Sequence, residues 1–387
     1  MNRSNTRNLL AEFDWLLFVA LAGLMIVGAL FIYSATMVNA ATASAPFYAQ
    51  RWFRQVVLWY GGGLVCAGLV STVSYHRITR FALVFYWANI VFLLGVLIPG
   101  IGSMRYGARR WIDLGFFQFQ PSEFAKLALI LALAHYLSRP KDELRDVRVF
   151  LNALAMIVLP FVLVLKEPDL GSALLLLPVG LVMMFVAGVP GRFLSYLVGG
   201  AVLVVSLLLV DVLFAPPEWQ IKLEDYQRRR LLVFFGRETR GGDSYNVRQA
   251  LISVGSGGLT GKGWMQGTQN ALGYLPRAVA HNDFIFSVIA EESGFVGSVI
   301  VITLYTVVLF VGIRIASEAR DRLGKLLATG GVTLLFCHVF INIGMNIRLM
   351  PVTGVPLPLL SYGGSSVLCS LIAAGLLQNV HIHRRSS

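Results

Sequence analysis

The chain has 387 residues, of which 56% are apolar and only 13% are charged, and its mean hydropathy is +0.71. About a quarter of the residues of a soluble globular domain are charged. The composition therefore argues against a soluble multi-domain enzyme, a disordered chain, a coiled coil and a disulfide scaffold. The length is enough for roughly ten membrane-spanning helices of about 20 residues, joined by short loops.

The net charge of +12 would suggest nucleic acid binding in a soluble protein, but in a membrane protein basic residues first of all set the orientation. We therefore expect no nucleic acid partner. The cysteines lie inside apolar runs, are odd in number and lack the spacing of metal ligands, so we expect them only to pack. They are Cys66, Cys337 and Cys369.

Ten apolar segments follow one another along the chain, and most are uncharged through their centres. They are continuous runs, which favours helices over the alternating strands of a membrane barrel. The first is longer than the usual core of a signal peptide, so we expect an uncleaved anchor. The sequence thus predicts an all-α polytopic membrane protein with about ten transmembrane helices in a single membrane domain, residues 1–387. The segments are 15–33, 55–73, 81–103, 122–137, 149–165, 170–189, 193–213, 284–313, 326–347 and 359–380.

The distribution of basic residues predicts the orientation. With the N terminus inside, the cytoplasmic pieces carry fifteen Lys and Arg residues, whereas the short outer loops and span mouths carry eight. Because short cytoplasmic loops are enriched in basic residues, we expect both termini in the cytoplasm. The long loop 215–282, between the seventh and eighth segments, then lies outside the cell. The eighth segment has 30 residues and must tilt, kink or project from the bilayer.

The outer side still carries seventeen basic residues, nine of them in the long loop. Orientation does not explain this charge. It indicates an anionic partner at the outer membrane surface, with phosphate as the first candidate. The alternative is ordinary solvated loop charge.

Within the long loop, the basic amphipathic stretch 226–235 suits a helix that lies at the membrane surface. A second short helix is expected over 246–254. Glycines then crowd residues 255–267, and Lys262 follows Gly261, but no Ser or Thr comes next and the spacing is not that of a nucleotide-binding loop. We expect a compact re-entrant loop that packs on the spans.

Charged groups inside spans or at their mouths are candidates for function. Arg109 and Arg110 flank Trp111 in an outer loop. Glu123 and Lys126 are three residues apart in the fourth segment and share one face of a helix. They form either an internal ion pair or a site in which Lys126 faces a phosphate.

Acidic residues supply the second set of candidates. Asp169, in an outer turn, either caps the sixth helix or belongs to the site. Asp283 stands where the long loop meets the eighth segment, where it either caps that helix or acts as a general base at the depth of the lipid head groups. Glu291 and Glu292 lie about two turns deeper and must be paired inward, with Lys126 or Arg248 as possible partners.

The stretch 342–366 combines three prolines with small polar groups, among them Ser365 and Ser366. This composition indicates a rigid, re-entrant backbone near a span mouth. Such backbone is tolerated at membrane depth only where protein buries it or where it lines a cavity.

Four motifs occur together: Gln120-Pro-Ser-Glu-Phe-Ala-Lys126, Glu167-Pro-Asp-Leu-Gly171, Asp283-Phe-Ile-Phe286, and Pro356-Leu-Pro followed by Ser361-Tyr-Gly-Gly-Ser-Ser366. With the ten segments and the long loop after the seventh, this combination resembles the SEDS family (shape, elongation, division and sporulation). The resemblance covers nearly the whole chain. Residues 261–269 and 351–354 are similar to RodA-type elongation members rather than to division members.

The resemblance implies a peptidoglycan glycosyltransferase of the bacterial cytoplasmic (inner) membrane, active in elongation and shape maintenance. The implied substrate is lipid II, the undecaprenyl-pyrophosphate-linked disaccharide peptide, polymerised on the outer face. The implied partners are a class B penicillin-binding protein transpeptidase and other membrane proteins of the elongation complex. Mg²⁺ or Mn²⁺ is implied as an assistant, without an organic cofactor, although no spacing in the sequence indicates a metal site.

The resemblance also assigns roles to residues. The essential aspartate of the family falls on Asp283, its outer-loop tryptophan on Trp111, and its fourth-helix acid and lysine on Glu123 and Lys126. The family usually reads Leu-Pro-Glu-x-His-Thr-Asp up to the aspartate. Residues 275–283 instead read Leu-Pro-Arg-Ala-Val-Ala-His-Asn-Asp, and Arg348 replaces a usual glycine. We expect an altered cavity shape around an unchanged carboxylate.

The implied reaction is attack of a sugar 4-hydroxyl on an anomeric carbon that carries lipid pyrophosphate. One base must take the hydroxyl proton, and cations must stabilise the departing pyrophosphate. Inversion at the anomeric carbon fits one direct displacement with Asp283 as the base. The candidate substrate-binding residues are Arg109, Arg110, Trp111, Glu123, Lys126, Asp169, Arg248, Lys262, Ser365 and Ser366.

Two other functions are compatible with a ten-span chain. A flippase for lipid II should line a path through both halves of the membrane with polar groups, whereas the polar motifs here gather on the outer side. A scaffold for the penicillin-binding protein would give Asp283 and the outer arginines no task.

Overall fold

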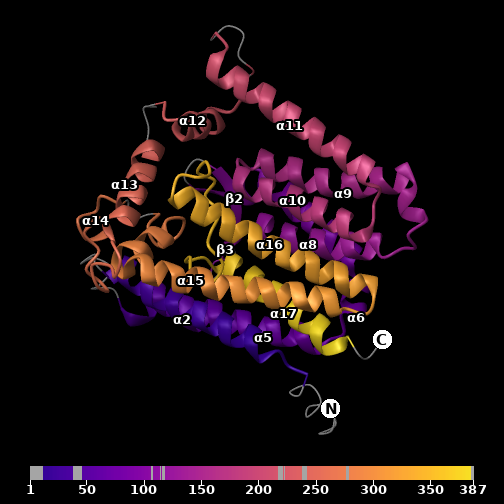
Figure 1. Cartoon of the computed structure of the whole chain (residues 1–387), viewed down its shortest axis with the longest axis horizontal. Coiled ribbons are helices and arrows are strands. Elements are labelled where there is room, and N and C mark those ends of the chain that lie inside the picture. The colour runs from indigo at the N-terminus through magenta and orange to yellow at the C-terminus, as the bar shows by residue number, and fades with distance from the viewer. Residues whose placement is uncertain are drawn as a thin grey trace.

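The computed structural model describes residues 12–37, 46–105, 108–113, 115, 118–216, 221, 223–237, 242–275 and 279–384. Within these ranges the chain forms a bundle of long apolar helices (Figure 1). Eight of the described helices are long and apolar enough to cross a membrane. They are α2 (Trp15–Met37), a composite helix (Arg51–Thr72), α9 (Val147–Lys166), α10 (Leu170–Ala187), α11 (Gly191–Phe214), α15 (Ile285–Glu318), α16 (Arg322–Asn346) and α17 (Gly364–His383).

Two shorter helices complete the bundle. α7 (Ala82–Leu97) has 16 residues and α8 (Pro121–Leu137) has 17. α8 is buried on nearly all sides because it packs against α7, α10 and α16 instead of lipid. The polytopic helical fold is therefore confirmed, and every predicted apolar segment contains a helix. The count of ten spans stays a prediction, since α7 and α8 are shorter than the other eight.

The helices differ greatly in how much protein surrounds them. α15 lies against both α2 and α16, and α17 packs along α5 (Gly61–Thr72), the last part of the composite helix. The most apolar stretches of α16 and α17 are each 72% buried inside the protein, whereas that of α11 is only 6% buried. Figure 1 shows α11 as an oblique helix at the edge of the bundle. The other described residues therefore leave almost all of its most apolar surface uncovered.

The composite helix is irregular in its middle. Its first turn is α4 (Arg51–Arg54), and a π-helical turn (Gln55–Tyr60) separates it from α5. Such turns widen the helix and redirect a side chain. Here the buried Gln55 donates from Nε2 to the carbonyl of Ser361 at 3.2 Å. The π turn thus ties the first half of the bundle to the proline-rich stretch before α17.

The loop after α7 contains a small sheet, which corrects the prediction of an apolar segment over 81–103 that is helical throughout. α7 ends at Leu97, and Pro99 and Gly100, the latter at a φ of +97°, turn the chain. Three antiparallel strands follow in the order β1 (Gly102–Arg105), β2 (Ala108–Asp113) and β3 (Gln118–Phe119). A helix cannot continue through this proline and this left-handed glycine. The sheet places Arg109, Arg110 and Trp111 on its central strand.

The long loop contains the two helices expected from its sequence, α12 (Asp225–Phe234) and α13 (Gly242–Ser256), and the short α14 (Thr268–Ala271). In Figure 1, α13 and α14 lie at one end of the bundle. The last turn of α17 and the connecting helix α6 (Tyr75–Arg80) lie at the opposite end. Single turns of 3-10 helix occur at η1 (Phe47–Ala49) and η3 (Glu143–Arg145).

α15 has 34 residues and breaks at Gly294, whose φ of 66° and ψ of −159° are not helical. Of the three expected alternatives, tilting, kinking or projecting from the bilayer, the structure shows a kink. The glycine-rich segment 257–263 fills the break through four backbone hydrogen bonds. Two amides of the segment donate into the helix, Lys262 to the carbonyl of Glu291 and Gly263 to that of Glu292, each at 3.0 Å. In return, the amides of residues 295 and 296 donate to the carbonyls of residues 258 and 259.

Candidate functional site

Asp283 lies directly before α15, at the junction with the long loop. Its backbone carbonyl accepts hydrogen bonds from the side-chain amides of Asn342 at 3.0 Å and Asn346 at 3.1 Å, both on α16. The N-cap of α15 is Phe284, and no side chain caps this helix. The structure therefore does not use Asp283 as a helix cap, and the carboxylate of this half-buried residue is available for another role.

Arg230 of α12 approaches the same place from the long loop. Its Nη1 donates to the carbonyl of Thr353 at 3.1 Å, and its guanidinium lies 5.6 Å from the ring centre of Tyr226. A Cβ atom at Gly354 would lie 3.4 Å from Oδ2 of Asp283 and 4.0 Å from Nη2 of Arg230. Gly354 has a φ of +73°. A glycine at this position thus lets the aspartate and the arginine approach the same stretch of backbone.

Charges from three elements act on Asp283. Removal from water raises the pKa of its carboxyl to about 6, the guanidinium groups of Arg230 and Arg110 oppose this shift, and Asp169 adds to it. A carboxyl that titrates near neutral pH can accept a proton from a hydroxyl group and release it again. The electrostatics therefore suit a general base whose pKa is influenced by two arginines.

Arg110 reaches the site from β2. Its Nε donates to the carbonyl of Glu167 at 3.2 Å, and its Nη2 donates to the carbonyl of Pro168. Asp169 follows at the start of α10, where Oδ1 accepts from the amide of Ser172 at 3.1 Å. Its Oδ2 accepts from the hydroxyl of Ser122 at 3.1 Å. The capping role of Asp169 is therefore confirmed, and its carboxylate also contributes negative charge to the site.

The sequence missed two residues of this cluster. The sequence predicts Arg230 only as part of a basic helix at the membrane surface, although its place one helical turn after Tyr226 indicates that both side chains share a face. Glu167 is the first residue of the Glu167-Pro-Asp-Leu-Gly171 motif, but the sequence predicts no role for it. It is fully buried, and neither of its carboxyl oxygens has a hydrogen-bond partner among the described residues.

Other predicted residues border the cluster. Arg109 and Trp111 are half-buried on β2. Trp111 is paired with Ser103 of β1, and its backbone carbonyl accepts a hydrogen bond from the Ser103 hydroxyl at 3.1 Å. Ser365 at the start of α17 donates to the carbonyl of Gln118 at 3.1 Å. It therefore joins β3 to the bundle. Ser366 is buried, and its carbonyl accepts from Ser370 at 2.8 Å.

Glu123 and Lys126 form the internal ion pair that was one of the two alternatives. Both side chains are buried, and Lys126 Nζ lies 2.7 Å from Glu123 Oε1. The same Nζ lies 3.0 Å from Nε2 of His338, whose Nδ1 is 3.2 Å from the carbonyl of Pro356. The lysine side chain is thus buried between α8 and α16. Contact between Lys126 and a phosphate stays a prediction.

Lys262 and the two adjacent acids of α15 belong to a second buried network. Lys262 Nζ lies 2.6 Å from Glu291 Oε1, and Glu292 Oε1 accepts from Ser34 at 2.5 Å. The expected pairing of these acids with Lys126 is therefore wrong. The re-entrant glycine loop instead brings Lys262 to Glu291. Arg248, the other expected partner, is exposed on α13.

The structure shows no cluster of metal-ligating side chains in the part of the chain that it describes. No group of three or more His, Cys, Asp or Glu side chains among these residues could hold a metal ion. Hard cations such as Mg²⁺ require several oxygen ligands. Mg²⁺ or Mn²⁺ therefore stays a prediction of the resemblance, and no chemical step is assigned to it below.

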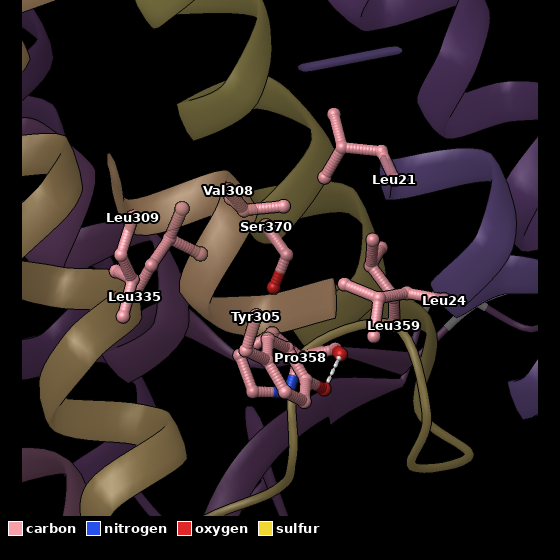
Figure 2. Close-up of a pocket in the computed structure, with 9 residues that line it drawn as sticks. All are labelled: Leu21, Leu24, Tyr305, Val308, Leu309, Leu335, Pro358, Leu359 and Ser370. Carbon is pink, nitrogen blue, oxygen red and sulfur yellow. Dashed lines mark hydrogen bonds between the residues drawn. The ribbon is translucent and has the colours of Figure 1, made fainter. Parts of the chain in front are cut away.

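Two cavities between the described helices are lined by uncharged side chains. The residues that line the first, from α2, α15, α16 and α17 and the stretch before α17, are drawn in Figure 2. This apolar gap has a volume of about 10 Å³, and beside it the Tyr305 hydroxyl donates to the carbonyl of Pro358 at 2.5 Å. A volume of this size holds one water at most. A pocket of about 280 Å³ lies between α13, α15 and α16, and its lining side chains, such as Phe286, Phe295 and Ile343, are uncharged. Neither cavity suits a pyrophosphate.

Comparison with known proteins places the chain. Residues 14–386 match the FtsW/RodA/SpoVE family, described as cell cycle proteins. The chain is 37% identical to the peptidoglycan glycosyltransferase MrdB of Escherichia coli K12, over 94% of this chain and 93% of that protein. It is 34% identical to the peptidoglycan glycosyltransferase RodA of Treponema pallidum, over 96% of this chain and 98% of that protein.

Solved structures are similar over almost the full length. A chain from a peptidoglycan synthase complex that coordinates polymerisation and crosslinking has a TM-score of 0.78 at 32% identity, covering 97% of this chain and 99% of that chain. The rod shape determining protein RodA of Thermus thermophilus has a TM-score of 0.67 at 32% identity, covering 97% and 98%. The sequence resemblance and the polytopic fold are thus confirmed, and this chain belongs to the FtsW/RodA/SpoVE family of integral membrane proteins.

Proposed function

We propose that this protein is a peptidoglycan glycosyltransferase that polymerises lipid II into glycan strands on the outer face of the bacterial cytoplasmic membrane. The observation that carries the proposal is the half-buried Asp283, whose carboxyl is under the electrostatic influence of the guanidinium groups of Arg230 and Arg110. The names of the relatives, peptidoglycan glycosyltransferases of the MrdB and RodA type, support the same activity and its role in cell elongation.

The chemistry of glycan polymerisation needs the groups that the cluster contains. Asp283 takes the proton of the acceptor 4-hydroxyl, and the oxygen of that hydroxyl bonds to the anomeric carbon of the donor. The bond from that carbon to the pyrophosphate breaks, and its electron pair goes to the phosphate oxygen. Arg110 and Arg230 stabilise this charge, because guanidinium groups match phosphate oxygens in geometry. One base and one displacement give inversion at the anomeric carbon.

The location and the partners are part of the proposal. The excess of basic residues in the predicted cytoplasmic loops supports cytoplasmic termini and a site that faces outward. The structural likeness to a chain of a synthase complex supports a class B penicillin-binding protein as partner. Such a partner would crosslink the strands that this protein makes, together with other membrane proteins of the elongation complex.

The test is polymerisation of purified lipid II by the purified full-length protein. We expect Asp283→Asn to abolish glycan synthesis, because the amide keeps the size of the side chain but cannot accept the proton. Loss of a general base typically costs about 10²–10⁴ in rate. Asp142→Asn, an exposed acid in the loop before α9, is the matched control and should keep wild-type rates.

Two further arms separate the alternatives. Assays with a chelator and with added Mg²⁺ or Mn²⁺ test the divalent ion. Assays with the penicillin-binding protein added test the dependence on a partner. Substantial glycan synthesis by Asp283→Asn would refute the assignment of the base. Movement of labelled lipid II across vesicles without any polymer would favour a flippase instead.

A further inference from the structure

Glu167 is a fully buried acid whose side chain has no polar partner in the described part of the chain. The residue has 0% exposure, and neither Oε1 nor Oε2 has a hydrogen-bond partner among the described residues. An ionised carboxylate in such a place would lose its hydration without compensation, which costs far more than burial of the neutral acid. The packing alone therefore favours the protonated, uncharged carboxyl.

The charged groups around Glu167 come from two neighbouring elements. Burial raises the pKa of its carboxyl to about 9, Asp169 at the start of α10 adds to the shift, and Arg110 on β2 opposes it. Asp283 before α15 has the same two electrostatic neighbours, Arg110 and Asp169, and Arg230 of α12 also acts on Asp283. The adjacent Lys166 is exposed. The burial and the acid next to it thus outweigh the single guanidinium.

The backbone of Glu167 holds the same arginine. Its carbonyl accepts Nε of Arg110 at 3.2 Å, and the carbonyl of Pro168 accepts Nη2. Both acceptors are neutral. The contacts that orient the guanidinium therefore do not cancel its charge.

We propose that Glu167 is a positioning residue that works only as the uncharged acid, fixing the Arg110 guanidinium through its backbone while leaving the Arg110 charge for the pyrophosphate of the substrate. The identity of that substrate rests on the proposed function. If Glu167 ionises, its carboxylate competes with the pyrophosphate for Arg110. Substrate binding should then weaken as the pH rises, while a neutral side chain at position 167 should not respond.

The kinetic test compares KM for lipid II across pH in three proteins. For the wild type we expect KM to rise several-fold between about pH 8 and 10, since a carboxyl changes from mostly neutral to mostly charged over about two pH units. Glu167→Gln should lack this rise, because the amide has no proton to lose. Glu143→Gln, an exposed acid in η3, should follow the wild type. An equal alkaline rise in Glu167→Gln, or a folded Glu167→Gln protein that is inactive at every pH, would overturn the proposal.

A second measurement needs no activity. Infrared difference spectra of wild type minus Glu167→Gln should contain the carbonyl-stretch band of a protonated carboxylic acid, which disappears on alkaline titration. Should the amide variant fail to fold, Glu167→Asp keeps an acid at this position and should shift the band. Absence of any such band refutes the neutral acid. A band in a wild-type protein that never polymerises lipid II would instead refute the proposed function and leave the protonation of Glu167 intact.

Discussion

Two carboxyl groups of one cluster hold their protons over different pH ranges, and the difference follows from their surroundings. Asp283 has two guanidinium groups as neighbours, which keep its pKa at about 6 despite desolvation. Glu167 has one guanidinium and a neighbouring carboxylate, and its pKa reaches about 9. At neutral pH the first is mostly ionised and the second is mostly protonated. Pairs of acids separated in this way indicate distinct roles in one site.

The ionisation of Asp283 should govern the acidic limb of the pH–rate profile. Below about pH 6 the base is protonated, so kcat/KM for lipid II should fall as the pH decreases. Arg230→Gln removes the strongest influence that lowers this pKa, and the limb should move to higher pH. Arg229→Gln, the exposed neighbour on α12, serves as the control. Initial polymerisation rates measured from about pH 5 to 8 check this prediction. An acidic limb at the same pH in Arg230→Gln and the wild type would contradict the influence of Arg230 on the pKa of Asp283.

At this scale the sequence located Asp283 but not Arg230, for a physical reason. Asp283 stands at a junction between a polar loop and an apolar run, a place that a linear pattern shows directly. Arg230 enters the site only because α12 docks on Thr353, a residue 123 positions away. Among three consecutive arginines, nothing local distinguishes the one that turns toward the bundle.

The sequence predicts the membrane helices well, because the length of an apolar run is enough to indicate such a helix. Each long apolar run became a helix, because the backbone must satisfy its own hydrogen bonds in lipid. The sheet over 102–119 was not foreseen, since its strands of two to six residues are too short to show an alternating pattern. The partner of Glu291 was also missed, because a loop that folds back into a span brings Lys262 to it.

The ion pair inside α8 supports a prediction at the scale of the element. Lys126→Met leaves Glu123 charged and buried, which should destabilise the protein by about 3–5 kcal/mol. The double variant Lys126→Met with Glu123→Gln removes both charges and should recover most of the lost thermal stability in detergent. Polymerisation by the double variant then decides the role of the lysine. Near-wild-type rates would restrict Lys126 to stabilising the fold, and continued inactivity would support contact with the substrate.

The bundle has two distinct ends, and charged side chains occur at both. The helices of the long loop lie at the first end, and α6 and the last turn of α17 lie at the second (Figure 1). Family membership and the eight apolar helices establish an integral membrane protein. Which end faces the cytoplasm is the prediction on which the mechanism depends, because lipid II is polymerised outside.

Cysteine labelling can test this orientation. In a background without Cys66, Cys337 and Cys369, a single cysteine at Ser244 on α13 should react with an impermeant thiol reagent in cells whose outer envelope is permeabilised. A single cysteine at Lys141, in the loop after α8, should react only after the inner membrane is opened. Both positions lie outside the apolar helices. The reverse labelling pattern would invert the topology and refute an outward-facing site.

The break in α15 has a consequence for how the long loop and this span move. A regular helix would join the amides of Phe295 and Val296 to the carbonyls of Glu291 and Glu292, four residues earlier. In α15 all four groups instead bond to the segment 258–263. The straight helix and the docked loop therefore compete for the same atoms. If the segment left the helix, these four backbone groups would lose their hydrogen-bond partners unless the regular helix formed in the same step. The loop and the span should thus behave as one cooperative unit, so a force on the outer loop is transmitted directly to the helix that begins beside Asp283.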